Sequence, residues 1–185
     1  MKIVIAIDSF KGSLSTFESG KAVSEGIKRV FPGAYTVVRP LADGGEGTVE
    51  AIVASRGGEL CRPTVTGPLG ESLEAVYGVV DRTAVIEMSA AAGLTLVPEG
   101  KRDPMNTTTY GVGEIIRHAI KEKGCRHFLI GIGGSATNDG GVGMLEALGF
   151  GFFDADGRPI ERGARGLEKL ARITSDGALP ELCEC

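Results

Sequence analysis

The stretch "IGIGGSATNDGGVG" (residues 130–143) places six glycines, and several small polar residues, between two apolar segments. The segment "RHFLIGI" (126–132) has the composition of a strand, and "GGVGMLEALG" (140–149) has the spacing of a helix. A strand, a glycine-rich turn and a helix start are the repeating unit of an α/β sheet. The backbone N–H groups of such a turn are suited to binding an anion.

Two familiar phosphate-binding motifs compete for this turn. A Walker A loop requires a lysine, and residues 130–143 contain none. Gly131, Gly133 and Ala136 match the dinucleotide pattern G-x-G-x-x-A, and Asp154 follows about twenty residues on. In that motif, however, the helix begins inside the glycine pattern, whereas "SATNDGG" intervenes here, and Asp154 lies in "DADGRP", which predicts a turn. A nicotinamide-dependent oxidoreductase is therefore kept only as an alternative.

Strand and helix patterns alternate along the rest of the chain. "KIVIAI" (2–7) predicts a strand buried on both faces. Ser15 and Glu18 predict a capping box at the start of a helix that ends at Pro32-Gly33. That helix carries its apolar residues on one side: Phe17, Val23, Ile27 and Val30. Further predicted elements are a strand at 35–41, a helix at 48–57, short strands between 60 and 88 with turns at 67–70 and 81–83, and a helix at 107–124.

This order predicts an α/β fold with an open, mostly parallel sheet, flanking helices and a strand-rich second domain. We assign residues 1–60 to the N-terminal part of a Rossmann-like domain and residues 61–185 to the second domain and the segments between domains. The 185 residues are 42% hydrophobic and 24% charged, which is typical of a soluble globular protein. The net charge of −4 does not favour nucleic acid as a partner, and no apolar run is long enough to span a membrane. Four cysteines without a C-x-x-C pair predict reduced thiols and a cytoplasmic protein.

Two more loops follow predicted strands, where open α/β sheets bind their ligands. In "DSFKGS" (8–13), Asp8 and Lys11 suit a metal–phosphate substrate, or else Asp8 caps the turn and Lys11 is solvated. In "LADGGEGT" (41–48), Asp43 and Glu46 offer oxygens to Mg²⁺. Thr48 is expected to cap the next helix, whose N-terminus favours an anion.

The strand predicted before Glu87 ends in a pair of polar residues. Glu87 and Ser89 follow the apolar run "TAVI". Either side chain contacts substrate or caps a helix, and the sequence leaves both open.

Together these loops resemble a known family. "KIVIAIDSFKGSLS", "PLADGGEGT", "IEMSAAAGL", "TTTYGVGEII" and "IGIGGSATNDGGVGMLEALG" are similar, in this order, to the signature segments of the bacterial glycerate kinases that form 2-phosphoglycerate. The resemblance implies ATP-dependent phosphorylation of D-glycerate with Mg²⁺ in glyoxylate or sugar-acid metabolism. It also implies two α/β domains with the active site between them. Members of the family run on for about as long again beyond "LPELCEC", so we expect this chain to be the N-terminal half, with an incomplete cleft.

The resemblance and the loop positions together assign roles to individual residues. Asp139 is the expected base for the glycerate hydroxyl, with Asp8 as the second choice, and Lys11 neutralises phosphate charge. Phosphate binding is assigned to Gly133, Gly134, Ser135, Thr137, Gly44 and Gly45. Substrate contacts are assigned to Ser9, Thr107 and Thr108, and Mg²⁺ to Asp43 and Glu46. The alternative within the family is an impaired fragment that binds ligand without turnover, and a homo-oligomer is left open.

Overall fold

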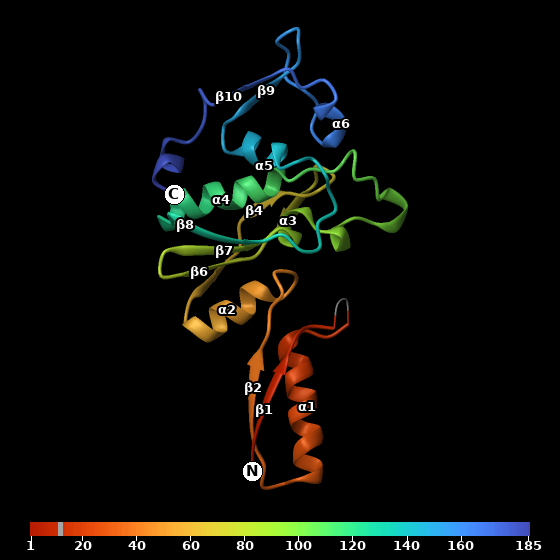
Figure 1. Cartoon of the computed structure of the whole chain (residues 1–185), viewed down its shortest axis with the longest axis vertical. Coiled ribbons are helices and arrows are strands. Elements are labelled where there is room, and N and C mark those ends of the chain that lie inside the picture. Colours follow the sequence, from red (N-terminus) through yellow and green to blue (C-terminus); the bar gives the residue numbers. More distant parts are fainter. Residues whose placement is uncertain (11–12) are drawn as a thin grey trace.

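The structure is a computed structural model and describes residues 1–10 and 13–185. Helices and strands alternate along much of the chain (Figure 1), but residues 59–87 contain only strands and the turns that join them. The strands are β1 (Lys2–Ile7), β2 (Tyr35–Pro40), β3 (Glu59–Cys61), β4 (Thr64–Thr66), β5 (Ser72–Glu74), β6 (Tyr77–Val80), β7 (Thr83–Glu87), β8 (His127–Gly131), β9 (Gly151–Phe153) and β10 (Arg172–Thr174). The α-helices are α1 (Thr16–Val30), α2 (Thr48–Arg56), α3 (Ser89–Ala92), α4 (Tyr110–Lys123), α5 (Val142–Ala147) and α6 (Ala164–Leu167). Short 3-10 helices are η1 (Leu94–Leu96), η2 (Glu99–Lys101) and η3 (Pro180–Glu184).

The strands β1 and β2 and the helix α1 form a narrow lobe at the N-terminal end of the molecule (Figure 1). β1 and β2 pair in parallel, with Lys2 opposite Tyr35 and Ile7 opposite Pro40. The predicted capping box is confirmed, because the Ser15 hydroxyl accepts from the Glu18 N–H and the Glu18 carboxylate accepts from the Ser15 N–H at 2.8 Å. Helix α1 therefore begins where the sequence indicates.

The side of α1 that packs on these strands is built from small residues. Thr16, Ser19 and Gly20 are its buried residues. The apolar residues predicted to share one side do not form the packed side, because Phe17, Val23 and Val30 are 41%, 40% and 70% exposed. Small side chains let the helix approach the strands closely. The close approach of α1 to β2 is also seen in the 2.7 Å hydrogen bond between the Ser24 and Thr36 hydroxyls.

The larger body is built on a four-stranded sheet in the order β3-β6-β7-β8. β7 and β8 are parallel, while β3 with β6 and β6 with β7 are antiparallel. The predicted turn at 81–83 is confirmed as a two-residue hairpin, in which Asp81 and Arg82 both have positive φ. The α/β class is confirmed, and in the described strands parallel pairing occurs between β1 and β2 and between β7 and β8.

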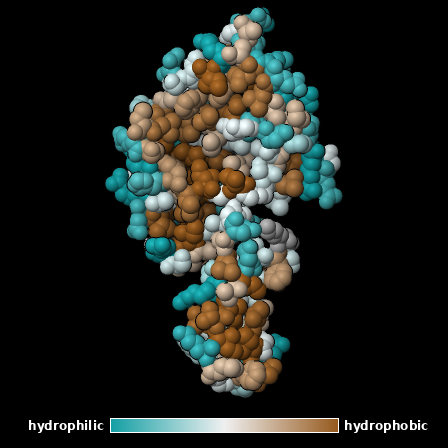
Figure 2. Space-filling view, in the orientation of Figure 1, coloured by the Kyte–Doolittle hydropathy of each residue, from teal (hydrophilic) through white to brown (hydrophobic). Residues whose placement is uncertain are grey.

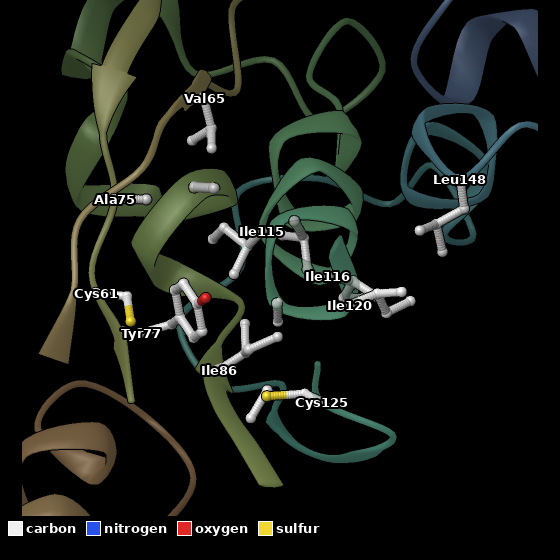
Figure 3. Close-up of a cluster of buried hydrophobic side chains, with 14 of the residues drawn as sticks. Cys61, Val65, Ala75, Tyr77, Ile86, Ile115, Ile116, Ile120, Cys125 and Leu148 are labelled. Carbon is white, nitrogen blue, oxygen red and sulfur yellow. The ribbon is translucent and has the colours of Figure 1, made fainter. Parts of the chain in front are cut away.

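Helix α4 supplies much of the core of this body (Figure 3). Val112, Ile115, Ile116, Ala119 and Ile120 are buried there, as the helical spacing predicts. They pack against strand residues such as Tyr77 and Ile86, which are fully buried. Full burial of one such aliphatic side chain contributes about 1.5–3 kcal/mol, so α4 contributes strongly to the stability of this core.

Helix α2 packs on β6 and β7, although it precedes the predicted domain boundary at residue 60. That boundary stays a prediction. Many apolar side chains stay exposed on the N-terminal lobe, and Figure 2 shows apolar residues gathered there. In the described part of the chain, no helix has the length and apolar character needed to cross a membrane.

Candidate functional site

The loops that follow β1, β2, β7 and β8 meet where the N-terminal lobe adjoins the larger body (Figure 1). The Gly133 N–H donates to the Gly44 carbonyl at 3.2 Å, and the Met88 N–H donates to the Gly131 carbonyl at 2.8 Å. The Ser9 hydroxyl lies 3.5 Å from the Glu46 carbonyl oxygen. The three glycine-rich or polar loops singled out in the sequence are therefore joined to each other and to the end of β7.

The glycines of the 130–143 stretch allow two backbones to touch. A Cβ at Gly131 would overlap the Gly44 carbonyl oxygen, and a Cβ at Gly133 would lie 2.9 Å from the Gly45 Cα. The first two glycines of the G-x-G-x-x-A pattern are thus required by loop packing. No helix begins within the G-x-G-x-x-A pattern, because the next helix, α5, begins only at Val142.

Asp154 does not occupy the position of a ribose-binding acid. Its Oδ1 accepts from the Asp156 N–H at 3.0 Å and from the Arg158 N–H at 2.8 Å, inside the tight turn predicted from "DADGRP". The dinucleotide alternative therefore has no support from this geometry.

The N-terminus of α2 already has a hydrogen-bond acceptor, which is the side-chain carboxyl group of Glu87. Its Oε1 accepts from the Val49 N–H at 2.8 Å. Burial raises the pKa of Glu87 above its ordinary value, and the hydrogen bonds from Val49, Thr48 and Gly47 partly oppose that shift. Of the two roles left open for Glu87, the structure shows the cap. A phosphate is not needed at this helix start.

Thr48 does not cap α2, so that prediction is wrong. Gly47 is the N-cap residue and makes no side-chain cap bond. The Thr48 hydroxyl accepts instead from the Gly44 N–H at 3.2 Å, which fixes the loop in front of the helix. Because Glu87 supplies the missing acceptor from a neighbouring strand, the helix has no need of a local cap.

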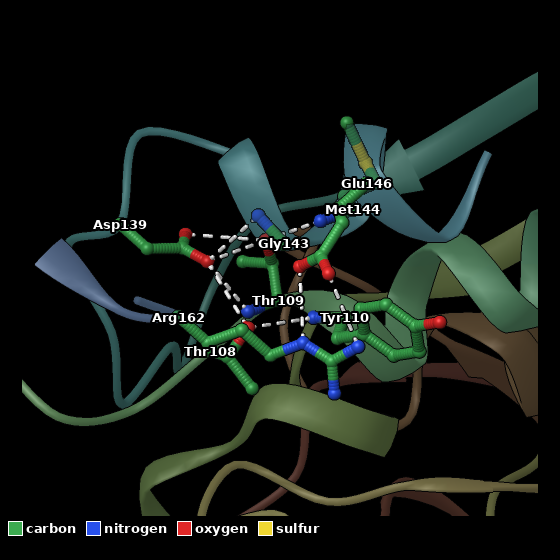
Figure 4. A network of polar contacts seen from close by, with 8 residues as sticks. All are labelled: Thr108, Thr109, Tyr110, Asp139, Gly143, Met144, Glu146 and Arg162. Atoms are coloured by element: carbon green, nitrogen blue, oxygen red, sulfur yellow. Dashed lines mark hydrogen bonds and ion pairs between the residues drawn. The ribbon is translucent and has the colours of Figure 1, made fainter. Parts of the chain in front are cut away.

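Asp139 lies at the centre of a buried network of hydrogen bonds (Figure 4). Its side chain is 1% exposed. Its carboxylate accepts from the N–H and hydroxyl of Thr109 at 2.8 and 2.9 Å, from the Gly141 N–H at 3.1 Å and from the Gly143 N–H at 3.2 Å. The Thr108 hydroxyl lies 3.4 Å away. These donors satisfy the acceptor capacity of a carboxylate and join the starts of α4 and α5.

The threonines before α4 point toward the same network. The Thr107 hydroxyl donates to the Ala136 carbonyl at 2.9 Å, and the Thr137 hydroxyl donates to the Thr107 carbonyl at 2.8 Å. Thr107 and Thr108 are buried. These contacts explain why α4 begins at Tyr110 and not at residue 107. The assignment of Thr107 and Thr108 to substrate binding stays a prediction, and their orientation favours a structural role.

Other predicted site residues remain accessible at the loop junction. Gly134, Ser135, Asp43 and Glu46 are exposed, while Asp8 and Ser9 are half-buried. The Asp8 carboxylate accepts from the Ser9 N–H at 2.7 Å, and the Asp43 carboxylate accepts from the Gly45 N–H at 2.9 Å. Lys11 lies outside the described residues.

The candidate metal ligands are few. Among residues 1–10 and 13–185, no group of three or more His, Cys, Asp or Glu side chains is placed to hold a metal ion. Mg²⁺ often binds through one or two carboxylates together with substrate phosphates, and the assignment of Asp43 and Glu46 to it stays a prediction.

Sequence reasoning missed Thr109, whose hydroxyl both contacts Asp139 and accepts from the Met144 N–H at 2.9 Å. The repeated threonine in "TTTYG" was the available signal, but a run of three gives no indication of which hydroxyl is central. Arg162 was also missed. It donates to both Glu146 oxygens, at 3.0 and 3.2 Å, and lies 3.6 Å over the Tyr110 ring, so it ties a distant loop to α4 and α5 (Figure 4).

Comparison with known proteins gives a consistent result across the chain. Residues 3–185 match the family described as "Glycerate kinase family". The glycerate kinase of Bacillus subtilis (strain 168) is 52% identical over 179 residues, which are 96% of this chain and 47% of that protein. The glycerate 2-kinase of Escherichia coli (strain K12) is 51% identical, over 100% of this chain and 49% of that protein.

A solved structure from Salmonella typhimurium LT2, assigned as a glycerate kinase 2, is similar in fold. It is 51% identical, the TM-score is 0.83, and the match covers 100% of this chain and 50% of that one. The chain thus spans about half the length of the curated relatives it matches.

Proposed function

Because this chain belongs to the glycerate kinase family, we propose that it carries one half of an active site that transfers the γ-phosphoryl group of ATP to D-glycerate. The observation that carries the proposal is the identity of about one residue in two, along the whole chain, to proteins named glycerate kinase. The product we propose is 2-phosphoglycerate, as the name of the Escherichia coli relative suggests.

The proposed reaction is an in-line displacement at the γ-phosphorus. The 2-hydroxyl oxygen of glycerate forms the new P–O bond, the bond to the ADP oxygen breaks, and the hydroxyl proton passes to a base. Such reactions depend mainly on positioning and on neutralising charge. Gly134 and Ser135 are exposed residues of the glycine-rich loop, and we assign phosphate contacts to the Gly134 backbone and the Ser135 hydroxyl.

Two aspartates are candidates for the base, and their surroundings favour Asp8. The Asp139 carboxylate is buried and already accepts several hydrogen bonds, so it has little capacity left for a substrate proton. Asp8 is half-buried at the end of β1, beside the loop junction. We therefore place the base at Asp8 and treat Asp139 as the residue that positions the loop.

Mg²⁺ is the cofactor that we propose for ATP, held by Asp43 and Glu46 together with the phosphates. When bound, the ion neutralises charge that develops on the phosphate oxygens. Asp43 and Glu46 lie on the loop in contact with the glycine-rich stretch, which is where a metal–phosphate complex would need them.

The test is a coupled assay of ADP release with D-glycerate and ATP–Mg²⁺, with L-glycerate as the matched control. It is run on the 185-residue chain alone and together with the polypeptide that forms the remainder of the Bacillus subtilis relative. We expect turnover of D-glycerate with both parts present, and ³¹P NMR should identify 2-phosphoglycerate. No ADP release with both parts in a folded complex, or formation of 3-phosphoglycerate, would contradict the proposal.

A second candidate is a fragment that binds ligand without turnover. It is favoured by one observation, namely that the chain covers only about half of its relatives. Isothermal titration with the non-hydrolysable ATP analogue AMP-PNP and Mg²⁺, together with the ADP-release assay, distinguishes it. This candidate predicts that the chain alone binds the analogue. It also predicts no ADP release, whether the chain is alone or together with the remaining polypeptide.

A further inference from the structure

Glu87 is a buried polar residue to which the proposed reaction assigns no role. It lies at the carboxyl end of β7 and is 9% exposed. Its Oε1 accepts from the Val49 N–H at 2.8 Å, and the N–H groups of Thr48 and Gly47 contribute hydrogen bonds as well. Val49 lies 38 residues earlier in the sequence, so this carboxyl group joins the four-stranded sheet to the segment that follows β2.

The end of β7 also contacts the glycine-rich loop that follows β8. The Met88 N–H donates to the Gly131 carbonyl at 2.8 Å. The Ser89 hydroxyl lies 3.5 Å from Glu87 Oε2, and a Cβ at Gly134 would lie 3.4 Å from the Ser89 Cβ. The end of β7 is therefore in contact with both of the loops that we expect to surround the ATP phosphates.

Residues 44–49, which we call the 44–49 segment, are anchored to the larger body at each end. At the start of the segment the Gly133 N–H donates to the Gly44 carbonyl at 3.2 Å, and at its end the backbone is bonded to Glu87. Gly44 and Gly47 have φ values of 88° and 93°, a left-handed conformation that glycine adopts without strain. Glycine also leaves a backbone with great conformational freedom, so the two anchors set where this segment lies.

The origin of the acceptor distinguishes positioning from simple capping. A helix start needs acceptors for its free N–H groups, and a Ser, Thr, Asp or Asn side chain at the N-cap normally supplies one. The N-cap of α2 is Gly47, which has no side chain, and the acceptor comes from β7 instead. A local cap moves with its helix, whereas Glu87 fixes the start of α2 relative to the sheet.

We propose that Glu87 is a positioning residue for phosphoryl transfer. Its carboxyl group fixes the spacing between the 44–49 segment and the glycine-rich loop, and so aligns the backbone groups that contact the ATP phosphates. This inference rests on the proposed function, because it takes these two loops as the phosphate-binding loops. Glu87 itself is buried, so it acts through the backbone and not by contact with ATP. A misplacement of about 1 Å can lower a rate by about a hundredfold, which gives such a residue a measurable effect.

The first experiment reports the spacing of the loops without any substrate. Hydrogen exchange is read at single amides by NMR in the 185-residue chain. In Glu87→Ala the Val49 amide loses its acceptor directly, whereas the Gly133 amide donates to Gly44 and reports whether the loops stay together. We expect exchange at Gly133 to become at least about tenfold faster. A cap without a positioning role predicts faster exchange at residues 47–49 alone, and that result would overturn the proposal.

Glu114→Ala is the matched control for this variant. Glu114 Oε2 also accepts from the backbone of a distant strand, since the Thr66 N–H donates to it at 2.6 Å, but this bond joins α4 to β4 and not to either loop. Its removal should lower stability in a similar way and leave exchange at Gly133 within about twofold of the wild type. Equal acceleration in the two variants would contradict the positioning role, because the effect would then follow general destabilisation.

The second experiment separates positioning from charge and from proton transfer. KM and kcat for ATP are measured in the enzyme assembled from this chain and the polypeptide that forms the remainder of the Bacillus subtilis relative. Glu87→Gln keeps the length of the side chain and an oxygen acceptor, so kcat/KM for ATP should stay within about threefold of the wild type. Glu87→Asp, which is one methylene shorter, and Glu87→Ala should lower it at least about tenfold, chiefly through KM.

The outcomes separate this inference from the proposed function. A loss of kcat in Glu87→Gln as large as that in Glu87→Ala would mean that charge or proton transfer matters, and the positioning role would be wrong. Wild-type kinetics in both Glu87→Asp and Glu87→Ala would also exclude it. If the wild-type assembly releases no ADP, the proposed function fails, and exchange at Gly133 still decides whether Glu87 spaces the two loops. If turnover is normal and exchange at Gly133 does not change, the proposed function stands and this inference fails.

Discussion

Asp139 is the residue at which a catalytic and a structural role can be separated. Its buried carboxylate accepts from the N–H groups of Thr109, Gly141 and Gly143. We predict that Asp139→Ala lowers the free energy of unfolding by about 3 kcal/mol or more, because these donors lose their acceptor. Urea denaturation measures the loss. Asn138→Ala, an exposed neighbour, should change it by less than about 0.5 kcal/mol.

The outcome for Asp139→Asn decides the role. A structural carboxylate predicts a clear loss of stability, since the amide NH₂ group would face N–H donors. If this variant keeps wild-type stability and the assembled enzyme loses turnover by orders of magnitude, Asp139 is the base and our placement of the base at Asp8 is wrong.

Glu87 should make stability depend on pH in an identifiable direction. Burial raises its pKa in the folded protein, so the folded state binds the proton more tightly than the unfolded state does. Its contribution to stability is therefore full below the unfolded pKa and is lost as the pH rises through the folded pKa. Compared with Glu87→Gln, the wild type should lose stability as the pH rises above the ordinary glutamate pKa of about 4.3, because the folded protein holds the Glu87 proton more tightly than the unfolded chain does.

The comparison with Glu87→Gln is needed because other carboxylates act in the opposite direction. The pKa values of Glu18 and Glu181 are lowered, by hydrogen bonds from Ser15 and Lys121 respectively, and both groups are present in either variant. Their effects therefore cancel in the difference between the unfolding free energies of the wild type and Glu87→Gln. A difference in unfolding free energy that stays constant over this pH range would contradict the assignment.

At the scale of elements, the contact between two loops depends on the absence of a side chain at Gly131. A Cβ there would overlap the Gly44 carbonyl oxygen. We predict that Gly131→Ala costs about 1–3 kcal/mol and, in the assembled enzyme, raises the KM for ATP, because the loops after β2 and β8 must move apart. Thermal unfolding and steady-state kinetics measure the two effects.

The control for this substitution lies in α1. Gly26 has open space where a Cβ would be placed, so Gly26→Ala should stabilise the protein by up to about 1 kcal/mol. Equal effects of the two substitutions would show that the loop contact is not tightly packed.

Local signals predicted most of the elements correctly, and contacts between elements account for what they missed. The capping box of Ser15 and Glu18 and the apolar spacing of α4 are short-range patterns, and both are confirmed. The start of α4 was misplaced because Thr109 bonds to Asp139, thirty residues away. The cap of α2 was misassigned because Glu87 comes from another strand, which a pattern around Thr48 does not reveal.

The candidate site follows the same rule. Sequence placed polar loops after strands, and these loops do meet, although β1 and β2 belong to a different sheet from β7 and β8. It did not reveal which way each side chain turns. Asp139 and Thr107 look as available as Ser135 in the sequence, yet the first two are buried and Ser135 is exposed. The glycines at 131 and 133 likewise match a ligand-binding pattern while serving a contact between backbones.

Over the whole molecule, the two lobes should differ in local stability. The larger body has α4 packed into a buried core, whereas β1 and β2 have one packed face and exposed apolar residues on the other. Regions with few buried apolar contacts open more readily than the core does. We predict that, in the chain alone, amides of β1 and β2 exchange hydrogen faster than those of β7 and α4.

Hydrogen exchange followed by mass spectrometry tests this, with peptides that cover residues 2–7 and 35–40 set against peptides that cover 83–87 and 110–123. Equal protection would mean that the lobe opens only when the whole chain unfolds, in which case its uncovered face costs little stability. Faster exchange confined to the lobe would mean that the Asp8 and Asp43 loops, which extend from β1 and β2, are held less firmly than the glycine-rich loop after β8. A kinase that aligns ATP and glycerate across these loops would then need the lobe stabilised before phosphoryl transfer becomes efficient.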